Sequence, residues 1–173
     1  MFVAIDRDGT LIEYVPYLTK LSDVSLIPGA GAAISRLNRV GVPVVLVTNQ
    51  PVLGKGLTTL STVIEIHELI GLQLSHYSAH LDAIFVCPHV TDIECDCRKP
   101  KPGLIQQASQ VLGQPTKNGI VVGDSERDME LAHFLGIVGL HVRTGPNHIS
   151  KFCNKSFANL YDAVEFILMS EIS

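Results

Sequence analysis

The stretch of sequence that decides the fold is residues 2–10, which read Phe2-Val3-Ala4-Ile5-Asp6-Arg7-Asp8-Gly9-Thr10. Four apolar residues are followed at once by carboxylates, an arginine and a glycine. A continuous apolar run of this kind is typical of a strand buried on both faces of a parallel sheet, because a half-exposed strand alternates apolar and polar residues. The stretch therefore predicts a buried strand that delivers polar side chains to one edge of a sheet.

Further apolar runs predict four more buried strands, at residues 42–47, 84–86, 119–122 and from 137 onward. Between the runs, apolar residues recur at spacings of three and four, which predicts helices over residues 29–40, 59–79, 103–112, 126–135 and 157–169. Strands that alternate with helices indicate an α/β fold with a doubly wound, Rossmann-like parallel sheet. We expect a single domain over residues 1–173.

The composition excludes several classes of protein. The chain has 13 Lys and Arg against 17 Asp and Glu, a net charge of -4, no Trp and 6% aromatic residues. A nucleic-acid-binding protein needs a basic surplus and often an aromatic platform, so we expect no nucleic-acid partner. The chain shows no secretory signal and no apolar run of about 18 residues, so we expect a cytoplasmic protein with no membrane partner. We also expect a monomer.

Polar side chains follow four of the predicted strands. They are Asp6 and Asp8, Thr48 and Asn49, Arg98 and Lys99, and Asp124 and Asp128. Ligands of doubly wound sheets bind outside the carboxyl ends of the strands, so we expect these side chains to form one site.

The residue types in this set suit magnesium and phosphate. Mg²⁺ binds a few carboxylates and keeps positions for water and substrate phosphate, and Asp6 and Asp124 would supply two carboxylates from neighbouring strands. A phosphoryl group needs positive charge and hydrogen-bond donors, which Lys99, the Thr48 hydroxyl and backbone N–H groups around Asn49 would provide.

Asp6 and Asp8 are two residues apart, so in an extended segment their side chains project to the same side. Asp6 would then act as the nucleophile while Asp8 handles the proton. The alternative is that each motif is structural, because Asp and Asn are common in turns and at helix N-termini. Their joint occurrence at four successive strand ends favours catalysis.

The four motifs resemble those of the haloacid dehalogenase superfamily of phosphatases. They are Asp6-Arg7-Asp8-Gly9-Thr10, Thr48-Asn49-Gln50, Lys99-Pro100 and Gly123-Asp124 with Asp128. The resemblance implies that Asp6 forms an aspartyl-phosphate and that Asp8 is first a general acid and then a general base. It implies that Mg²⁺ lies on Asp6, the Asp8 backbone carbonyl and Asp124, and that Asp128 orients Lys99 or metal-bound water.

A cysteine and histidine cluster occupies residues 87–97, with Cys87, His89, Cys95 and Cys97 in the pattern C-x-H-x5-C-x-C. Three thiolates and an imidazole form a closed tetrahedral Zn²⁺ site, which predicts a structural zinc loop. The alternative is a set of free thiols with an incidental histidine. Cys153 is distant in sequence, and we expect it not to bind the metal.

This cluster resembles the zinc-loop branch of the superfamily, which includes heptose-bisphosphate and histidinol-phosphate phosphatases and has no large cap domain. The resemblance implies Mg²⁺-dependent removal of the 7-phosphate of a heptose 1,7-bisphosphate, in the synthesis of lipopolysaccharide heptose. Histidinol phosphate is the alternative substrate, and a polynucleotide end is a more remote one. A bisphosphate needs cations for its second phosphate, and Arg98 and Lys55 are the candidates. The chain departs from the pattern at Pro51-Val52, at Lys55 and at Ser125, where the branch often has Ser-Gly, Arg, and Lys or Arg.

Overall fold

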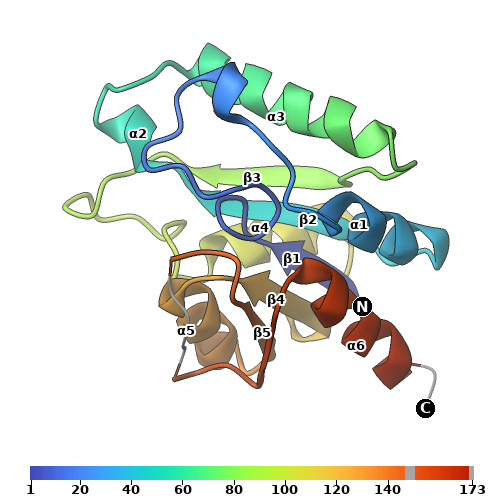
Figure 1. The fold of residues 1–173 in the computed structure, drawn as a ribbon. Helices are drawn as coiled ribbons and strands as arrows, with labels where there is room; N and C mark the ends of the chain where they lie inside the picture. Colours follow the sequence, from blue (N-terminus) through green and yellow to red (C-terminus); the bar gives the residue numbers. More distant parts are fainter. Residues whose placement is uncertain (147–150, 172–173) are drawn as a thin grey trace.

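The computed structural model describes residues 1–146 and 151–171 (Figure 1). Its centre is a six-stranded sheet in the order β3-β2-β1-β4-β5-β6, in which every neighbouring pair is parallel. The strands are β1 (Phe2–Ile5), β2 (Val44–Asn49), β3 (Ala83–Cys87), β4 (Gly119–Gly123), β5 (Val138–Val142) and β6 (Lys155–Phe157). The chain runs outward from β1 to β3 and returns to build β4 to β6 on the other side. The switch point of the sheet therefore lies between β1 and β4.

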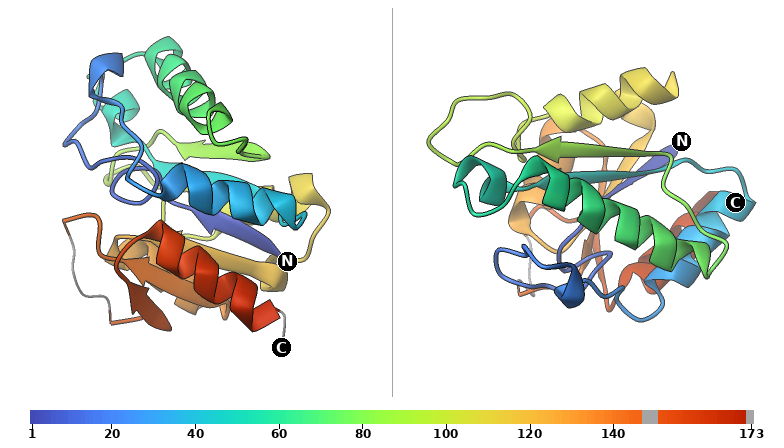
Figure 2. Two further views of the ribbon diagram at one scale, coloured as in Figure 1. Left: turned by 45° about the vertical axis from the view of Figure 1, so that its right-hand side comes forward. Right: turned by 90° about the horizontal axis from the view of Figure 1, so that it is seen from above.

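Helices cover both faces of the sheet (Figure 2). They are α1 (Ala30–Arg39), α2 (Pro51–Gly54), α3 (Leu60–Ser75), α4 (Gly103–Leu112), α5 (Glu126–Leu135) and α6 (Leu160–Glu171), with short 3-10 turns at Leu21–Asp23 and Thr116–Asn118. One apolar cluster joins the sheet to α1, α3 and α6, and a second joins it to α4 and α5. The predicted doubly wound architecture is confirmed, and no large cap is inserted in the described part of the chain.

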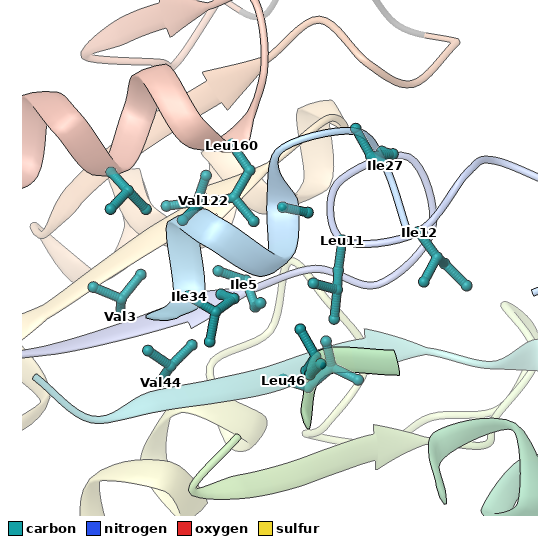
Figure 3. Packing of buried hydrophobic residues seen from close by; sticks show 14 of the residues in the cluster. Val3, Ile5, Leu11, Ile12, Ile27, Ile34, Val44, Leu46, Val122 and Leu160 are labelled. Atoms are coloured by element: carbon teal, nitrogen blue, oxygen red, sulfur yellow. The ribbon is translucent and has the colours of Figure 1, made fainter. Parts of the chain in front are cut away.

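The first strand shows why its sequence is apolar throughout. Val3 and Ile5 belong to the cluster under α1, whereas Phe2 and Ala4 belong to the cluster under α4 and α5. Successive side chains of a strand point to opposite faces, so a strand covered on both faces needs apolar residues at every position. Figure 3 shows Val3 and Ile5 of β1 together with Ile34 of α1 in the first of these clusters.

Element boundaries differ from the sequence-based expectation in several places. The strand expected at 42–47 is Val44–Asn49, and the helix expected to reach 79 ends at Ser75. The shift in β2 follows from pairing with β3, which continues to Asn49 opposite Cys87. The strand β6 and the helix α2 were not predicted from the sequence, because they have only three and four residues and therefore carry no usable periodicity.

The carboxyl ends of the strands and the loops that follow them gather at one end of the molecule, at the left in Figure 1. Within residues 1–146 and 151–171, no helix is both long and apolar enough to cross a membrane.

Candidate active site

A cavity of about 270 Å³ lies at the switch point of the sheet. Its lining includes seven residues that the sequence predicted for the site: Asp6, Asp8, Thr48, Asn49, Arg98, Lys99 and Asp124. They come from the ends of β1 and β2, the loop after β3 and the end of β4. The parallel sheet thus brings residues more than 100 positions apart to one edge.

Lys99 lies between two carboxylates beneath this cavity. Its ammonium group is 2.8 Å from Asp6 Oδ1 and 2.6 Å from Asp128 Oδ1, and it also donates a 2.8 Å hydrogen bond to the Val47 carbonyl. Burial by itself lowers the pKa of Lys99, but the charges of Asp128 and Asp6 outweigh that effect and raise it. Lys99 is therefore a fixed donor at the floor of the site, and it is charged at neutral pH.

Asp128 is completely buried and is held from its own helix. Its Oδ2 accepts hydrogen bonds from the backbone N–H and the hydroxyl of Ser125, in a capping box that starts α5. The helix start thus fixes the carboxylate that in turn fixes Lys99. The resemblance implied that Asp128 orients Lys99 or metal-bound water, and the structure places its carboxylate in contact with Lys99.

The carboxylates of Asp6, Asp124 and Asp128 each offer an oxygen within 4.8 Å of the other two. Burial raises the pKa of Asp6 to about 6, with Lys99 opposing the shift, and burial together with the charge of Asp6 raises the pKa of Asp124 to about 8. Lys99 alone therefore does not balance the negative charge of the three carboxylates, and a further cation would do so. Carboxylate oxygens are the ligands that Mg²⁺ prefers. These residues fit a bound Mg²⁺.

The Asp8 carboxylate belongs to a second network, which the sequence analysis did not foresee. Arg7 donates hydrogen bonds of 3.0 Å to both oxygens of Asp8 and one of 2.9 Å to Gln50 Oε1. The Gln50 amide donates to Asp8 Oδ2 at 2.9 Å and to the Thr48 hydroxyl at 2.8 Å. Arg7, buried to 1% exposure, and Gln50 therefore hold Asp8 and Thr48 in place.

Asn49 uses its side chain to fix the loop that carries Lys99. Its Oδ1 accepts from the Lys99 backbone N–H at 3.0 Å, and its Nδ2 donates to the Lys99 carbonyl at 3.1 Å. The last residue of β2 is thereby clamped to the segment that follows the cysteine cluster.

Two glycines allow Asp124 its position. A Cβ at Gly145 would overlap the Asp124 carboxylate, and a Cβ at Gly9 would lie 2.8 Å from Asp124 Oδ2. The buried His141 ring lies 3.0 Å from the Asp124 carbonyl oxygen, and the Thr144 hydroxyl donates to the Gly9 carbonyl at 2.6 Å. None of Gly145, His141 and Thr144 was assigned to the site from the sequence.

Cys87, His89, Cys95 and Cys97 each offer a ligand atom within 4.8 Å of the other three. Burial and the neighbouring thiols raise the pKa of Cys97 to about 12, so crowded thiolates require a cation to compensate them. Three sulfur donors and an imidazole nitrogen match the tetrahedral set that Zn²⁺ takes in structural sites. The residues fit zinc, and Cys153 lies outside the group.

The two cations proposed for a second phosphate behave differently. Arg98 lines the cavity, and it donates to the His89 carbonyl at 2.8 Å and to the Thr91 hydroxyl at 3.4 Å, which ties it to the cysteine loop. Lys55 is not among the lining residues. Its ammonium donates to the Tyr17 hydroxyl at 2.9 Å and lies 4.4 Å from the centre of that ring.

Comparison with known proteins identifies the class. The family model of haloacid dehalogenase-like hydrolases matches residues 21–136. The chain belongs to this family, and it is a phosphatase. Phosphatases of the family use Mg²⁺.

Its relatives share one named activity. The chain is 35% identical, over 83% of its length and 80% of the relative, to the D-glycero-beta-D-manno-heptose-1,7-bisphosphate 7-phosphatase of Bordetella bronchiseptica. It is 37% identical, over 75% of its length and 70% of the relative, to the D-glycero-alpha-D-manno-heptose-1,7-bisphosphate 7-phosphatase of Mycobacterium tuberculosis. The D,D-heptose 1,7-bisphosphate phosphatase of B. bronchiseptica, solved with magnesium and phosphate, superposes with a TM-score of 0.89 at 30% identity, covering 98% of this chain and 99% of that one.

Proposed function

We propose that this chain removes the 7-phosphate of D-glycero-D-manno-heptose 1,7-bisphosphate. The observation that carries the proposal is the similarity, over nearly the whole chain, to the phosphatase of that sugar from B. bronchiseptica. The arrangement of Asp6, Asp8, Lys99 and Asp124 around one cavity supports it. The relatives include enzymes named for the beta and for the alpha anomer, so the test below uses both.

In the proposed reaction, a carboxylate oxygen of Asp6 attacks phosphorus, and the bond from phosphorus to the C7 oxygen breaks. Asp8 donates its proton to that oxygen, and the sugar leaves as an alcohol. Asp8 then takes a proton from water as the water attacks the aspartyl-phosphate, which frees inorganic phosphate and regenerates Asp6. The charge of Lys99 stabilises the phosphoryl oxygens, and the Thr48 hydroxyl donates a hydrogen bond to them.

Asp6, the backbone carbonyl of Asp8 and Asp124 would hold Mg²⁺, which supplies positive charge between the nucleophile and the phosphate dianion when bound. Cys87, His89, Cys95 and Cys97 would hold a structural Zn²⁺. Because Arg98 is tied to the His89 carbonyl, an ordered loop keeps that guanidinium at the cavity. The loop thus serves as a fixed partial lid.

The test compares kcat/KM for both anomers of the heptose bisphosphate with kcat/KM for histidinol phosphate and a 5′-phosphorylated oligonucleotide. We expect one anomer to be preferred over histidinol phosphate by about 100-fold or more, which corresponds to about 2.7 kcal/mol in transition-state binding. Asp6→Asn should abolish Mg²⁺-dependent phosphate release, whereas Asp162→Asn on α6 should not. Preference for histidinol phosphate or the oligonucleotide would overturn the assignment.

A further inference from the structure

Four cationic side chains line the active-site cavity, and three of them are already committed. They are Arg7, Arg98, Lys99 and Arg127. Arg7 is bound to Asp8 and Gln50, Lys99 to Asp6 and Asp128, and Arg98 to the cysteine loop. The side chain of Arg127, in contrast, is exposed and makes no hydrogen bond or ion pair with any residue that the structure describes. Among the described residues that line the cavity, Arg127 is the one cation whose side chain has no hydrogen-bond or ion-pair partner, whereas Arg98 is bound only by neutral oxygens.

The position of Arg127 is fixed although its side chain is free. It lies in the first turn of α5, between the capping residue Ser125 and Asp128. Successive residues of a helix project about 100° apart, so Asp128 can point inward to Lys99 while Arg127 points toward the cavity mouth. The capping box of Ser125 and Asp128, which fixes Lys99 at the floor of the site, therefore also fixes the backbone of Arg127 at the rim of the cavity.

The two walls of the cavity differ in chemistry. Arg127 stands on α5, on the α4 and α5 face of the sheet, together with Arg98 from the loop that leads into α4. Tyr14 and Tyr17 line the cavity from the segment between β1 and α1. Leu11 and Leu18 of the same segment pack in the apolar cluster on the other face of the sheet, under α1, α3 and α6. A ligand in the cavity thus meets a cationic wall on one side and an aromatic wall on the other.

A sugar with two phosphates places two dianions in this site. The reacting phosphate takes the floor, where Lys99 lies. The other phosphate needs a cation beyond the floor, and a guanidinium with free N–H groups binds a phosphate through paired, charge-assisted hydrogen bonds. Lys55 contacts Tyr17 and does not line the cavity, and the two terminal nitrogens of Arg98 each spend one N–H on the cysteine loop, whereas all five N–H groups of Arg127 are free of described partners.

We infer that Arg127 binds the phosphate that is not transferred, and that it thereby sets the preference for a bisphosphorylated over a monophosphorylated sugar. This inference rests on the proposed function and assigns its second phosphate to a residue that the sequence analysis did not select.

The test measures the ratio of kcat/KM for heptose 1,7-bisphosphate to kcat/KM for heptose 7-phosphate, which lacks the second phosphate. We expect Arg127→Ala to lower this ratio by about 10-fold or more through KM, in line with the loss of a charge-assisted pair. The ratio for Arg127→Lys should lie between those of the wild type and Arg127→Ala, because lysine keeps the charge but lacks the planar guanidinium. Arg39→Ala, an exposed arginine on α1, is the matched control. An unchanged ratio in Arg127→Ala, or an equal loss for both substrates, would overturn the inference.

A binding measurement separates this inference from the proposed function. Calorimetry compares the binding of heptose 1,7-bisphosphate to Asp6→Asn and to Asp6→Asn/Arg127→Ala, so no turnover is needed. Weaker binding by the double variant supports the role of Arg127 even if the wild-type enzyme prefers another phosphate ester. Equal binding by the two forms contradicts that role even if the wild-type enzyme prefers the bisphosphate.

Discussion

Lys99 donates a 2.6 Å hydrogen bond to Oδ1 of Asp128, and both side chains are buried. Asp128→Asn removes the charge that stabilises the buried ammonium, so the pKa of Lys99 should fall. We expect kcat to drop by about 10- to 100-fold and the alkaline limb of the pH profile to move to lower pH, because the lysine then loses its proton sooner. Glu130→Gln, the same change elsewhere on α5, is the control. An unshifted alkaline limb would contradict this role.

The second prediction concerns Gln50, which connects Arg7, Asp8 and Thr48. Gln50→Leu keeps the volume but deletes three hydrogen bonds, so Asp8 should lose its fixed position. We expect kcat for the sugar phosphate to fall by about 10-fold or more, and stability to fall by about 1–3 kcal/mol. Hydrolysis of p-nitrophenyl phosphate should suffer less, since nitrophenolate leaves without a proton.

The comparison of the two leaving groups decides how Gln50 acts. Equal losses for the sugar phosphate and for p-nitrophenyl phosphate would show that Gln50 does not act through proton transfer. Gln106→Leu, on the exposed side of α4, is the control for the amide-to-alkyl change.

The third prediction is that Mg²⁺ binding releases protons. In the metal-free protein the pKa of Asp124 is raised to about 8, so at pH 7 this carboxyl is mostly protonated and must ionise to bind the metal. Mg²⁺ affinity should therefore weaken as pH falls, by about 10-fold per unit below pH 8, and more steeply below the pKa of Asp6 at about 6. Calorimetry in two buffers of different ionisation enthalpy counts the protons. A Mg²⁺ affinity that does not change between pH 6 and pH 8 would contradict this prediction.

The fourth prediction tests the zinc loop. Cys97→Ser should lose bound zinc, because one of four ligands is gone, and the loop that carries Arg98 should lose its order. We expect a higher KM and a lower melting temperature, read alongside zinc content by atomic absorption. Cys153→Ser should keep the zinc. Unchanged kinetics in zinc-stripped, Mg²⁺-supplied protein would refute the partial-lid role.

The fifth prediction uses the close approach of Gly145 to Asp124. Gly145→Ala places a methyl group where the Asp124 carboxylate lies, so the carboxylate must move. We expect Mg²⁺ affinity to fall by about 10-fold, with the fold retained, since the displaced group is a metal ligand. Gly71→Ala on α3 meets nothing within 4 Å and serves as the control. Wild-type affinity in Gly145→Ala would show that Asp124 tolerates the displacement or does not bind the metal.

The sequence alone determined the layered fold and most of the residues at its catalytic edge. Continuous apolar runs such as residues 2–5 are local signals of strands buried on both faces, and polar groups directly after such strands must meet at one edge. Asp6 and Asp124 could be selected for this reason, and Lys99 because it follows the third strand after the cysteine cluster. The close spacing of Cys87, His89, Cys95 and Cys97 made the metal cluster visible in the same way.

Only the tertiary structure decided which side chains at the catalytic edge of the sheet form hydrogen bonds and ion pairs with one another. Arg7 beside Asp8 reads as one charge among many until Gln50, 43 residues on, is found to bind it. Arg127 stands out only because the other lining cations are seen to have partners, and the contact of Lys55 with Tyr17, outside the lining, is visible only in the structure. Strand and helix signals depend on neighbours in the sequence, whereas these pairings depend on strand order and on contacts between distant segments, which no local pattern encodes.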